Sequence, residues 1–101
     1  MVKPTYQIVW TTRSQQHLKQ AFNFISKDSL QNAEKVINAI VAGVEKAATN
    51  PEHYGKDKYK KNNDGTYRAF EKYHYRVSYR FAEATIRILR VRHTSMEPKA
   101  Y

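Results

Sequence analysis

The sequence contains no cysteine, which excludes disulfide bonds and thiolate chemistry, and four scattered histidines do not predict a structural zinc site. The lack of cysteine fits a reducing compartment, and we expect a cytoplasmic protein. No segment approaches the roughly 20 apolar residues that span a bilayer, and the first ten residues lack the apolar run of a signal peptide. We therefore expect no membrane contact.

Glycine and acidic residues are scarce, and this excludes further classes of function. The three glycines, Gly43, Gly55 and Gly65, form no phosphate-cradling loop. The nine acidic residues form no evident carboxylate pair or metal site, and neither Ser78 nor Ser95 lies in a nucleophile-elbow motif. These absences argue against metal-dependent and serine hydrolases, and no cofactor is expected.

Basic residues are abundant instead. The chain has 18 Lys+Arg against 9 Asp+Glu, a formal net charge of +9, which implies an anionic partner. Twelve of the 18 basic residues lie in residues 51–101, so we expect the functional surface in that half. A chain of 101 residues with 41% hydrophobic residues is long enough for one packed domain and too short for two, and we treat residues 1–101 as a single domain.

Apolar residues at helical spacing predict two amphipathic helices. The second runs from about Leu30 to Thr49 and ends at Asn50-Pro51, because proline cannot continue the hydrogen-bond ladder. The first ends near Lys27 and begins at one of three candidate N-caps, Thr11, Thr12 or Ser14. Since the break between them is short, the two helices should form an antiparallel hairpin with a joint apolar face to cover.

Four segments read as strands: a short one at 6–10 and three more at about 66–71, 74–81 and 85–92. The segment 51–65 between the second helix and these strands is rich in lysine and turn residues, so we expect an exposed loop. The predicted order is strand, helical hairpin, basic loop and three-stranded meander.

Alternation separates two faces in the third of these strands. Apolar and aromatic side chains share one face, namely Tyr75, Val77, Tyr79 and Phe81, and the other face carries His74, Arg76, Ser78 and Arg80. The last strand is less regular, because Ile86 and Ile88 share one face whereas Leu89 and Val91 share the other. Either both of its faces are partly covered or a bulge shifts its phase.

Five basic side chains from three adjoining strands are candidates for a site: Arg68, Arg76, Arg90, Arg92 and His93. Guanidinium groups bind phosphate bidentately, and histidine exchanges a proton near neutral pH. Together they suit cleavage of RNA without a metal, in which the 2′-hydroxyl attacks and the arginines stabilise charge. The alternative is that these arginines are solvated surface and the histidine is a structural hydrogen-bonding group.

The order of elements resembles the RelE/ParE superfamily of toxins from type II toxin-antitoxin systems. The resemblance covers nearly the whole chain, and three short motifs carry it: Gly65 to Phe70, Tyr75 to Tyr79, and the last strand with its histidine-x-serine-methionine-acid ending, His93 to Glu97. It implies an α+β fold in which the N-terminal strand joins the three-stranded antiparallel meander in one mostly antiparallel four-stranded sheet.

Two functions compete within this superfamily. The ParE branch resembles the chain in its final motif and implies binding of DNA gyrase, with Arg90, Arg92, Met96, Lys60 and Lys61 as target-binding candidates. The RelE branch implies a metal-independent, ribosome-dependent mRNA endoribonuclease. Its candidate catalytic residues here would be Arg68, Arg76, His93 and Tyr101, the last to stack on a base.

The sequence also departs from the typical pattern of each branch. The paired lysines of typical RelE nucleases are missing near Tyr67 and Ala69, whereas the ParE strand usually lacks an arginine where Arg76 stands. Either branch implies a cognate antitoxin whose C-terminal segment folds along the toxin, with acidic residues opposite the arginines and apolar ones in a groove beside the helices. A homodimer through the two helices is possible on this resemblance.

Overall fold

Six elements follow one another in the computed structural model, which describes residues 5–96 and 99–101. They are β1 (Gln7–Trp10), α1 (Thr12–Ser26), α2 (Leu30–Thr49), β2 (Tyr67–Lys72), β3 (Tyr75–Ala82) and β4 (Thr85–His93). The α+β order expected from the sequence is confirmed, and each boundary lies within one residue of its predicted place.

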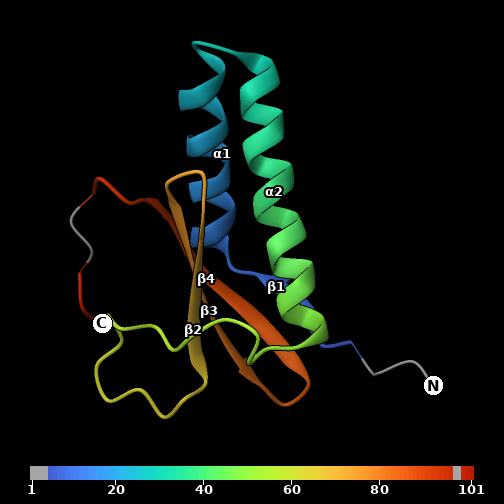
Figure 1. Ribbon diagram of the computed structural model, residues 1–101, viewed down its shortest axis with the longest axis vertical. Helices are drawn as coiled ribbons and strands as arrows, with labels where there is room; N and C mark the ends of the chain where they lie inside the picture. Colours follow the sequence, from blue (N-terminus) through green and yellow to red (C-terminus); the bar gives the residue numbers. More distant parts are fainter. Residues whose placement is uncertain (1–4, 97–98) are drawn as a thin grey trace.

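The four strands form one sheet in the order β1-β4-β3-β2 (Figure 1). β1 runs parallel to β4, and β2, β3 and β4 form an antiparallel meander. This confirms the mostly antiparallel four-stranded sheet. Because β1 lies at one edge beside the last strand, the two ends of the chain contribute neighbouring strands.

Side-chain caps fix where both helices begin. The Thr11 hydroxyl accepts a hydrogen bond from the Ser14 amide at 3.1 Å, so Thr11 is the N-cap among the three candidates. The Ser29 hydroxyl accepts from the Asn32 amide at 3.1 Å and starts α2 directly after the short break. The result is the predicted antiparallel hairpin, whose connecting end extends past one end of the sheet (Figure 1).

The helical hairpin covers one face of the sheet, and the core lies between these two layers. α1 packs on β4, and α2 contacts β1, β2 and β4. Ile40 and Val44 of α2 belong to the same core cluster as the sheet residues Val77 and Tyr79, and all four are fully or almost fully buried. The Tyr79 hydroxyl donates to the Pro51 carbonyl at 2.6 Å, so this buried phenol has a partner. We call the opposite face of the sheet the outer face.

A β-bulge explains the irregular pattern of the last strand. Ser78 pairs with Arg90 and Tyr79 pairs with Ile88, so Leu89 has no partner on β3. The extra residue shifts the alternation by one step, which lets Ile86, Ile88 and Val91 all face the helices. Of the two alternatives left open by the sequence, the bulge is the correct one.

The connection from α2 to β2 is not the fully exposed loop that we expected. Residues 55–57 lie along the free edge of β2, where the Asp57 amide donates to the Tyr67 carbonyl at 2.8 Å and the Ala69 amide donates to the Gly55 carbonyl at 3.2 Å. Asp57 is only 2% exposed. The expectation was wrong for this part because the edge strand offers unpaired backbone groups that the loop satisfies.

Both hairpin turns are made without glycine. Tyr73 and His74 join β2 to β3 with φ of 48° and 68°, and Glu83 and Ala84 join β3 to β4 with φ of 51° and 60°. Positive φ at both central residues is the geometry of a tight type I′ turn, which matches the twist of the strands. These turns set the register that brings the arginines of the outer face together.

Candidate functional site

The outer face of the sheet carries the cationic cluster. Because Val77 and Tyr79 of β3 face the helices, Arg76 and Ser78 face outward. The register places Arg76 opposite Arg92 of β4, and Ser78 opposite Arg90. On the other side of Arg76 the register places Glu71 of β2, so the cluster spans three strands.

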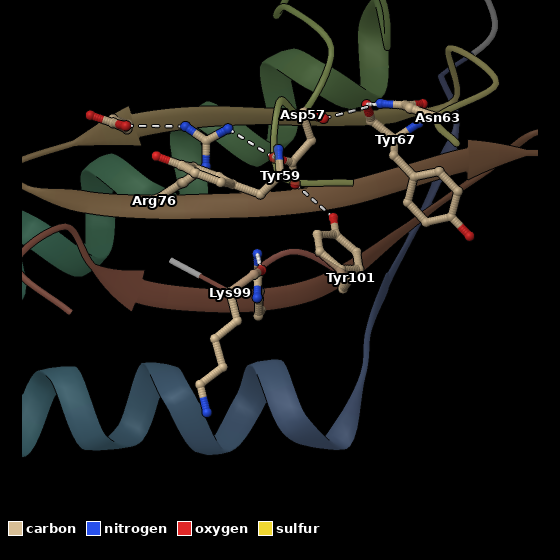
Figure 2. Close-up of polar contacts among 9 residues, drawn as sticks. Asp57, Tyr59, Asn63, Tyr67, Arg76, Lys99 and Tyr101 are labelled. Atoms are coloured by element: carbon tan, nitrogen blue, oxygen red, sulfur yellow. Dashed lines mark hydrogen bonds and ion pairs between the residues drawn. The ribbon is translucent and has the colours of Figure 1, made fainter. Parts of the chain in front are cut away.

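Arg76 is the centre of this cluster, and both ends of its guanidinium group are held by carboxylates. Its Nη2 donates to Asp57 Oδ1 at 2.9 Å and its Nη1 donates to Glu71 Oε2 at 3.1 Å (Figure 2). The side chains of Arg76 and Asp57 are 14% and 0% exposed, so this ion pair is shielded from solvent. The ring of Tyr59 lies 4.9 Å from the guanidinium carbon and covers it.

Tyr101 closes the cluster from the side of the 51–65 loop. Its hydroxyl donates to Asp57 Oδ2 at 2.6 Å, so the two oxygens of Asp57 hold Tyr101 and Arg76 (Figure 2). The backbone of Tyr101 exchanges two hydrogen bonds with the loop, donating to the Tyr59 carbonyl at 2.9 Å and accepting from the Lys61 amide at 2.6 Å. The Arg90 guanidinium carbon lies 4.3 Å from the centre of its ring.

The ionisation of Asp57 and Tyr101 follows from this network. Burial on its own raises the pKa of Asp57, but the hydrogen bonds from Tyr101, Arg76 and the Tyr59 amide and the charge of Arg76 outweigh it, so the pKa lies below 3.8. Burial and the adjacent carboxylate raise the pKa of the Tyr101 phenol. Asp57 is therefore ionised and Tyr101 is protonated at neutral pH.

Two of the predicted catalytic residues are aligned in register with helix-facing residues of β3, although His93, at the end of β4, also lines the small pocket beside Arg76. Arg68 shares the helix-facing side with its neighbour Tyr79, where its Nε donates to the Gly65 carbonyl at 2.8 Å and its Nη1 donates to the Tyr54 carbonyl at 3.0 Å. His93 pairs with Tyr75, and its ring meets that phenol ring edge-on at 5.1 Å. Of the four proposed catalytic residues, Arg76 and Tyr101 share Asp57 as a partner, and His93 lines the same small pocket as Arg76, whereas Arg68 lies apart from them.

His93 also joins the turn that follows β4. Its Nδ1 accepts from the Ser95 amide at 3.0 Å and lies 2.7 Å from the Ser95 hydroxyl. The final motif of the sequence therefore forms a local hydrogen-bonded turn, apart from Glu97, which lies outside the described residues.

The candidate target-binding residues fall into two groups. Arg92 and Met96 are exposed beside each other, with Arg92 Nη2 at 3.7 Å from the Met96 sulfur. Lys60 instead lies over the ring of Tyr67 at 4.7 Å and donates to the Tyr101 carbonyl at 3.3 Å. Lys61 is exposed near it, and Arg90, which is half-buried, lies between the two groups.

An apolar groove runs between α1 and the end of β4. It contains a cavity of about 430 Å³, whose walls include Phe24, Tyr75 and Met96. A second cavity of about 340 Å³ shares Phe24 and Tyr75 with it and reaches Tyr73. Phe24, Met96 and Tyr73 are 66%, 50% and 50% exposed, although they are large apolar side chains. This groove is the second candidate surface, and an apolar patch of this kind marks an interaction site.

Sequence reasoning missed Asp57, the residue that organises the outer face. It stands in a run of lysines, Lys56 to Lys61, which reads as a solvated loop. The available signal was its solitary negative charge within a run of lysines, in the half of the chain that is rich in arginine. That signal names a candidate ion pair but not its partner, because the pairing depends on how the loop follows the edge of β2.

Two further properties concern the part of the chain that the structure describes, residues 5–96 and 99–101. No three histidine, aspartate or glutamate side chains within it lie close enough together to hold a metal ion. None of its helices is both long and apolar enough to cross a bilayer.

Comparison with known proteins agrees on one family. A family model described as "ParE toxin of type II toxin-antitoxin system, parDE" matches residues 8–98. No curated protein sequence matches the chain. The solved "Chromosomal ParDE TA system from P. aeruginosa" contains a similar chain, with a TM-score of 0.66 and 18% identity over 88% of this chain and 96% of that chain.

A second solved structure, the toxin-antitoxin complex RelBE2 from Mycobacterium tuberculosis, gives a TM-score of 0.63 and 20% identity over 88% of this chain and 91% of that chain. At these identities the likeness establishes a shared fold. The fold is thus found in chains from both a ParDE and a RelBE system, whereas the family model matches the ParE toxins.

Proposed function

Because the chain belongs to the family of ParE toxins of type II toxin-antitoxin systems, we propose that it arrests growth as a gyrase inhibitor. In this proposal the protein binds DNA gyrase and traps its cleaved DNA complex, and it performs no catalysis of its own. Both targets considered for the superfamily lie in the cytoplasm, so we place the toxin there as well.

The observation that carries this proposal is the pairing of Arg76. A ribonuclease of the RelE kind would use this arginine to stabilise charge on the phosphate in the transition state. Here both of its terminal nitrogens are bonded to carboxylates, and its side chain is 14% exposed. An arginine that is already neutralised and covered is poorly placed to bind a phosphate, which supports a structural role.

The exposed residues near the end of β4 are better placed to contact a large target. Arg92 and Met96 are solvent-exposed, and neither takes part in the Asp57 network. Arginine and methionine are both enriched where proteins bind one another. We assign the gyrase-binding surface to this region, with Arg90 behind it and Lys60 and Lys61 at its far side.

The alternative is a RelE-like mRNA endoribonuclease, and one observation favours it. Arg76, Arg90, Arg92 and Tyr101 gather on one face of the sheet, and a tyrosine ring beside several guanidinium groups suits an RNA base and its phosphate. Arg68 lies on the other face, and His93, although it lines the small pocket beside Arg76, packs its ring against Tyr75 and accepts a hydrogen bond from the Ser95 amide.

One pair of assays separates the two functions. Purified toxin is added to gyrase with supercoiled plasmid, and in parallel to ribosomes translating a reporter mRNA. We expect cleaved plasmid in the first assay and intact mRNA in the second. Cuts in the mRNA, without any cleaved DNA, would show that the nuclease alternative is correct.

Substitutions then test the assignment of residues. Arg92→Gln should weaken gyrase poisoning by at least tenfold, whereas the matched control Arg87→Gln on the same strand should not. If the protein is instead a nuclease, Arg76→Ala should lower mRNA cleavage at least tenfold, about 1.4 kcal/mol of transition-state stabilisation. All variants are compared at equal concentrations of folded protein.

The protein acts together with a cognate antitoxin, as toxins of this type do. We propose that the antitoxin binds in the apolar groove, because exposed Phe24 and Met96 need an apolar cover and the adjoining His17, Arg92 and His93 favour an acidic partner. Expression without antitoxin should arrest growth, and normal growth despite abundant folded protein would contradict the toxin assignment.

A homodimer through α1 and α2 stays a prediction, for which size-exclusion chromatography with light scattering is the test.

A further inference from the structure

The part of β4 that extends past β1 is held by a histidine. β1 pairs with β4 only as far as Trp10 opposite Ile88, and the chain then turns into α1. Val91 therefore lies beyond the end of β1. Its amide donates instead to Nδ1 of His17 on α1 at 3.0 Å, across 74 positions of the sequence. The imidazole thus takes the place that the carbonyl of a neighbouring strand would occupy.

Only a neutral imidazole can make this hydrogen bond. A neutral ring has one nitrogen that accepts and one that donates, and since Nδ1 of His17 accepts, its proton lies on Nε2. Protonation adds an N–H at Nδ1, which would then face the N–H of Val91. Val91 is only 3% exposed, so its amide has little access to water as a substitute acceptor. Protonation of His17 therefore breaks the contact between α1 and β4 at this point.

The charges around His17 oppose its protonation in the folded state. The titratable and charged groups near it come from α1, β3 and β4, and they are Arg13, Tyr75, Arg90, Arg92 and His93. Among the residues that the structure describes, no carboxylate lines the groove beside it. Burial and the neighbouring arginines lower the pKa of His17 below 6.5. The ring is therefore neutral at pH 7, and acid favours a state in which it has left Val91.

His17 and Val91 also form part of the apolar groove between α1 and β4. Together with Phe24 and Met96 they line its cavity of about 430 Å³. The hydrogen bond between His17 and Val91 joins the helix on one side of the groove to the strand on the other, so it sets the width of the groove. When this bond is lost the two sides can separate, and an apolar side chain in the groove then loses contacts on one side.

We propose that His17 is a proton-sensitive latch, which holds the groove in its binding shape while the ring is neutral and releases it when the ring is protonated. His17 is a positioning residue here, because it acts through the backbone of β4. The groove is the antitoxin site under the proposed function, and on that function rests the consequence that acid loosens the antitoxin. Charge alone predicts the opposite direction, since a protonated histidine attracts an acidic partner more strongly.

Nuclear magnetic resonance on the whole chain tests the latch. The imidazole signals of His17 and the amide signal of Val91 are followed from about pH 8 to about pH 5, the range in which histidines titrate. We expect both to move with one common midpoint, and the Val91 amide proton to move to higher field because it loses its acceptor. A Val91 amide that stays in place while His17 titrates would overturn the latch.

Variants connect that movement to His17. The side-chain oxygen of glutamine accepts a hydrogen bond and takes up no proton in this pH range, so His17→Gln should make the Val91 amide signal independent of pH. The matched control His53→Gln, at an exposed position, should behave like the wild type. His17→Leu has no acceptor and should show the released Val91 signal at every pH. A Val91 amide that still responds to pH in His17→Gln would show that another group is responsible.

Indole, a neutral aromatic probe, measures the groove itself through the signals of Phe24 and Met96. Its affinity for the wild type should fall at least about threefold over the same pH range and stay constant for His17→Gln. Equal or tighter binding in acid would overturn the link between the latch and the groove.

Failure of this inference can be told apart from failure of the proposed function, because these measurements need neither antitoxin nor gyrase. A toxin that arrests growth but shows a pH-independent Val91 amide refutes the latch alone. A protein that shows the latch but permits normal growth supports the latch and refutes the proposed function.

Discussion

The buried carboxylate of Asp57 makes the sharpest prediction about stability. Asp57→Ala removes the acceptor of three hydrogen bonds, from Arg76, Tyr101 and the Tyr59 amide. It also leaves the guanidinium group of Arg76, 14% exposed, with only the half-exposed Glu71 as counter-ion. Both effects act on the folded state, so the free energy of unfolding should fall.

The size of the loss can be worked out from the burial of each partner. Removing one member of a buried ion pair costs about 3–5 kcal/mol. Since Glu71 still compensates part of the charge, we expect the lower end, about 3 kcal/mol, which corresponds to a fall in Tm of at least about 12 °C for a domain of this size. Asp57→Asn keeps the shape but loses the charge and turns one accepting oxygen into an NH2 donor, so it should destabilise the protein as well, though less than Asp57→Ala because one oxygen still accepts.

Urea denaturation followed by circular dichroism measures these values, with Asp28→Asn as the control at an exposed position. The double variant Asp57→Ala/Arg76→Met should be more stable than Asp57→Ala alone, because it removes the orphaned charge. If Asp57→Ala unfolds like the control, or if the double variant recovers nothing, the ion pair does not organise the outer face as we argue.

Acid adds an independent check on Asp57. Because the folded-state pKa of Asp57 lies below its usual 3.8, its contribution is complete above about pH 3.8 and is lost as the pH falls through the lower folded-state value. The wild-type protein should therefore lose more stability than Asp57→Asn when the pH falls below 3.8. Parallel curves for the two proteins would contradict the depressed pKa.

Three further predictions concern the helices and a turn. Burial and nearby arginines lower the pKa of His17 below 6.5, and its Nδ1 accepts a hydrogen bond from the Val91 amide at 3.0 Å. Protonation of His17 therefore opposes the folded state, and acidification below pH 6.5 should lower the Tm of the wild type more than that of His17→Gln. Gly43→Ala gains about 1 kcal/mol of helix propensity but places Cβ at 2.5 Å from the Phe70 ring, where overpacking costs about 1–3 kcal/mol, so urea denaturation should show a net loss. Ala84→Gly removes the steric strain of a side chain at positive φ, which is about 1–2 kcal/mol. It also raises the conformational entropy of the unfolded chain, which costs about 0.4–1 kcal/mol, so the net effect should be a higher Tm.

Local patterns in the sequence were sufficient to predict the helices and strands of the fold. Helical spacing and Asn50-Pro51 located α2 without error, and β-branched and aromatic runs located the strands. Turn residues were less informative, because neither hairpin uses the Asn-Gly or Asp-Gly signal of a tight turn. The resemblance to the RelE/ParE superfamily supplied the joining of the N-terminal strand to the meander, whereas the parallel pairing of β1 with β4 was not predicted, because no local pattern contains it.

The site was predictable only in part. Alternation correctly placed Arg76 and Ser78 on the face opposite Val77 and Tyr79. It could not separate Arg68 from Arg76, because the face of a residue on β2 depends on its register with β3. Nor could it show that Asp57 neutralises Arg76, since that contact joins residues 19 positions apart through a loop without regular structure.

The bulge at Leu89 has a consequence for how the length of this protein can vary. If Leu89 were deleted, the side chains from Ile86 to His93 would alternate regularly between the two faces. All the remaining side chains of β4 would then keep the face that they have now. A deletion at this single place is therefore compatible with both the core and the arginines, whereas a deletion at Ile88 or Arg90 would remove one of their members. Among relatives that differ by one residue in this strand, the gap should fall at position 89.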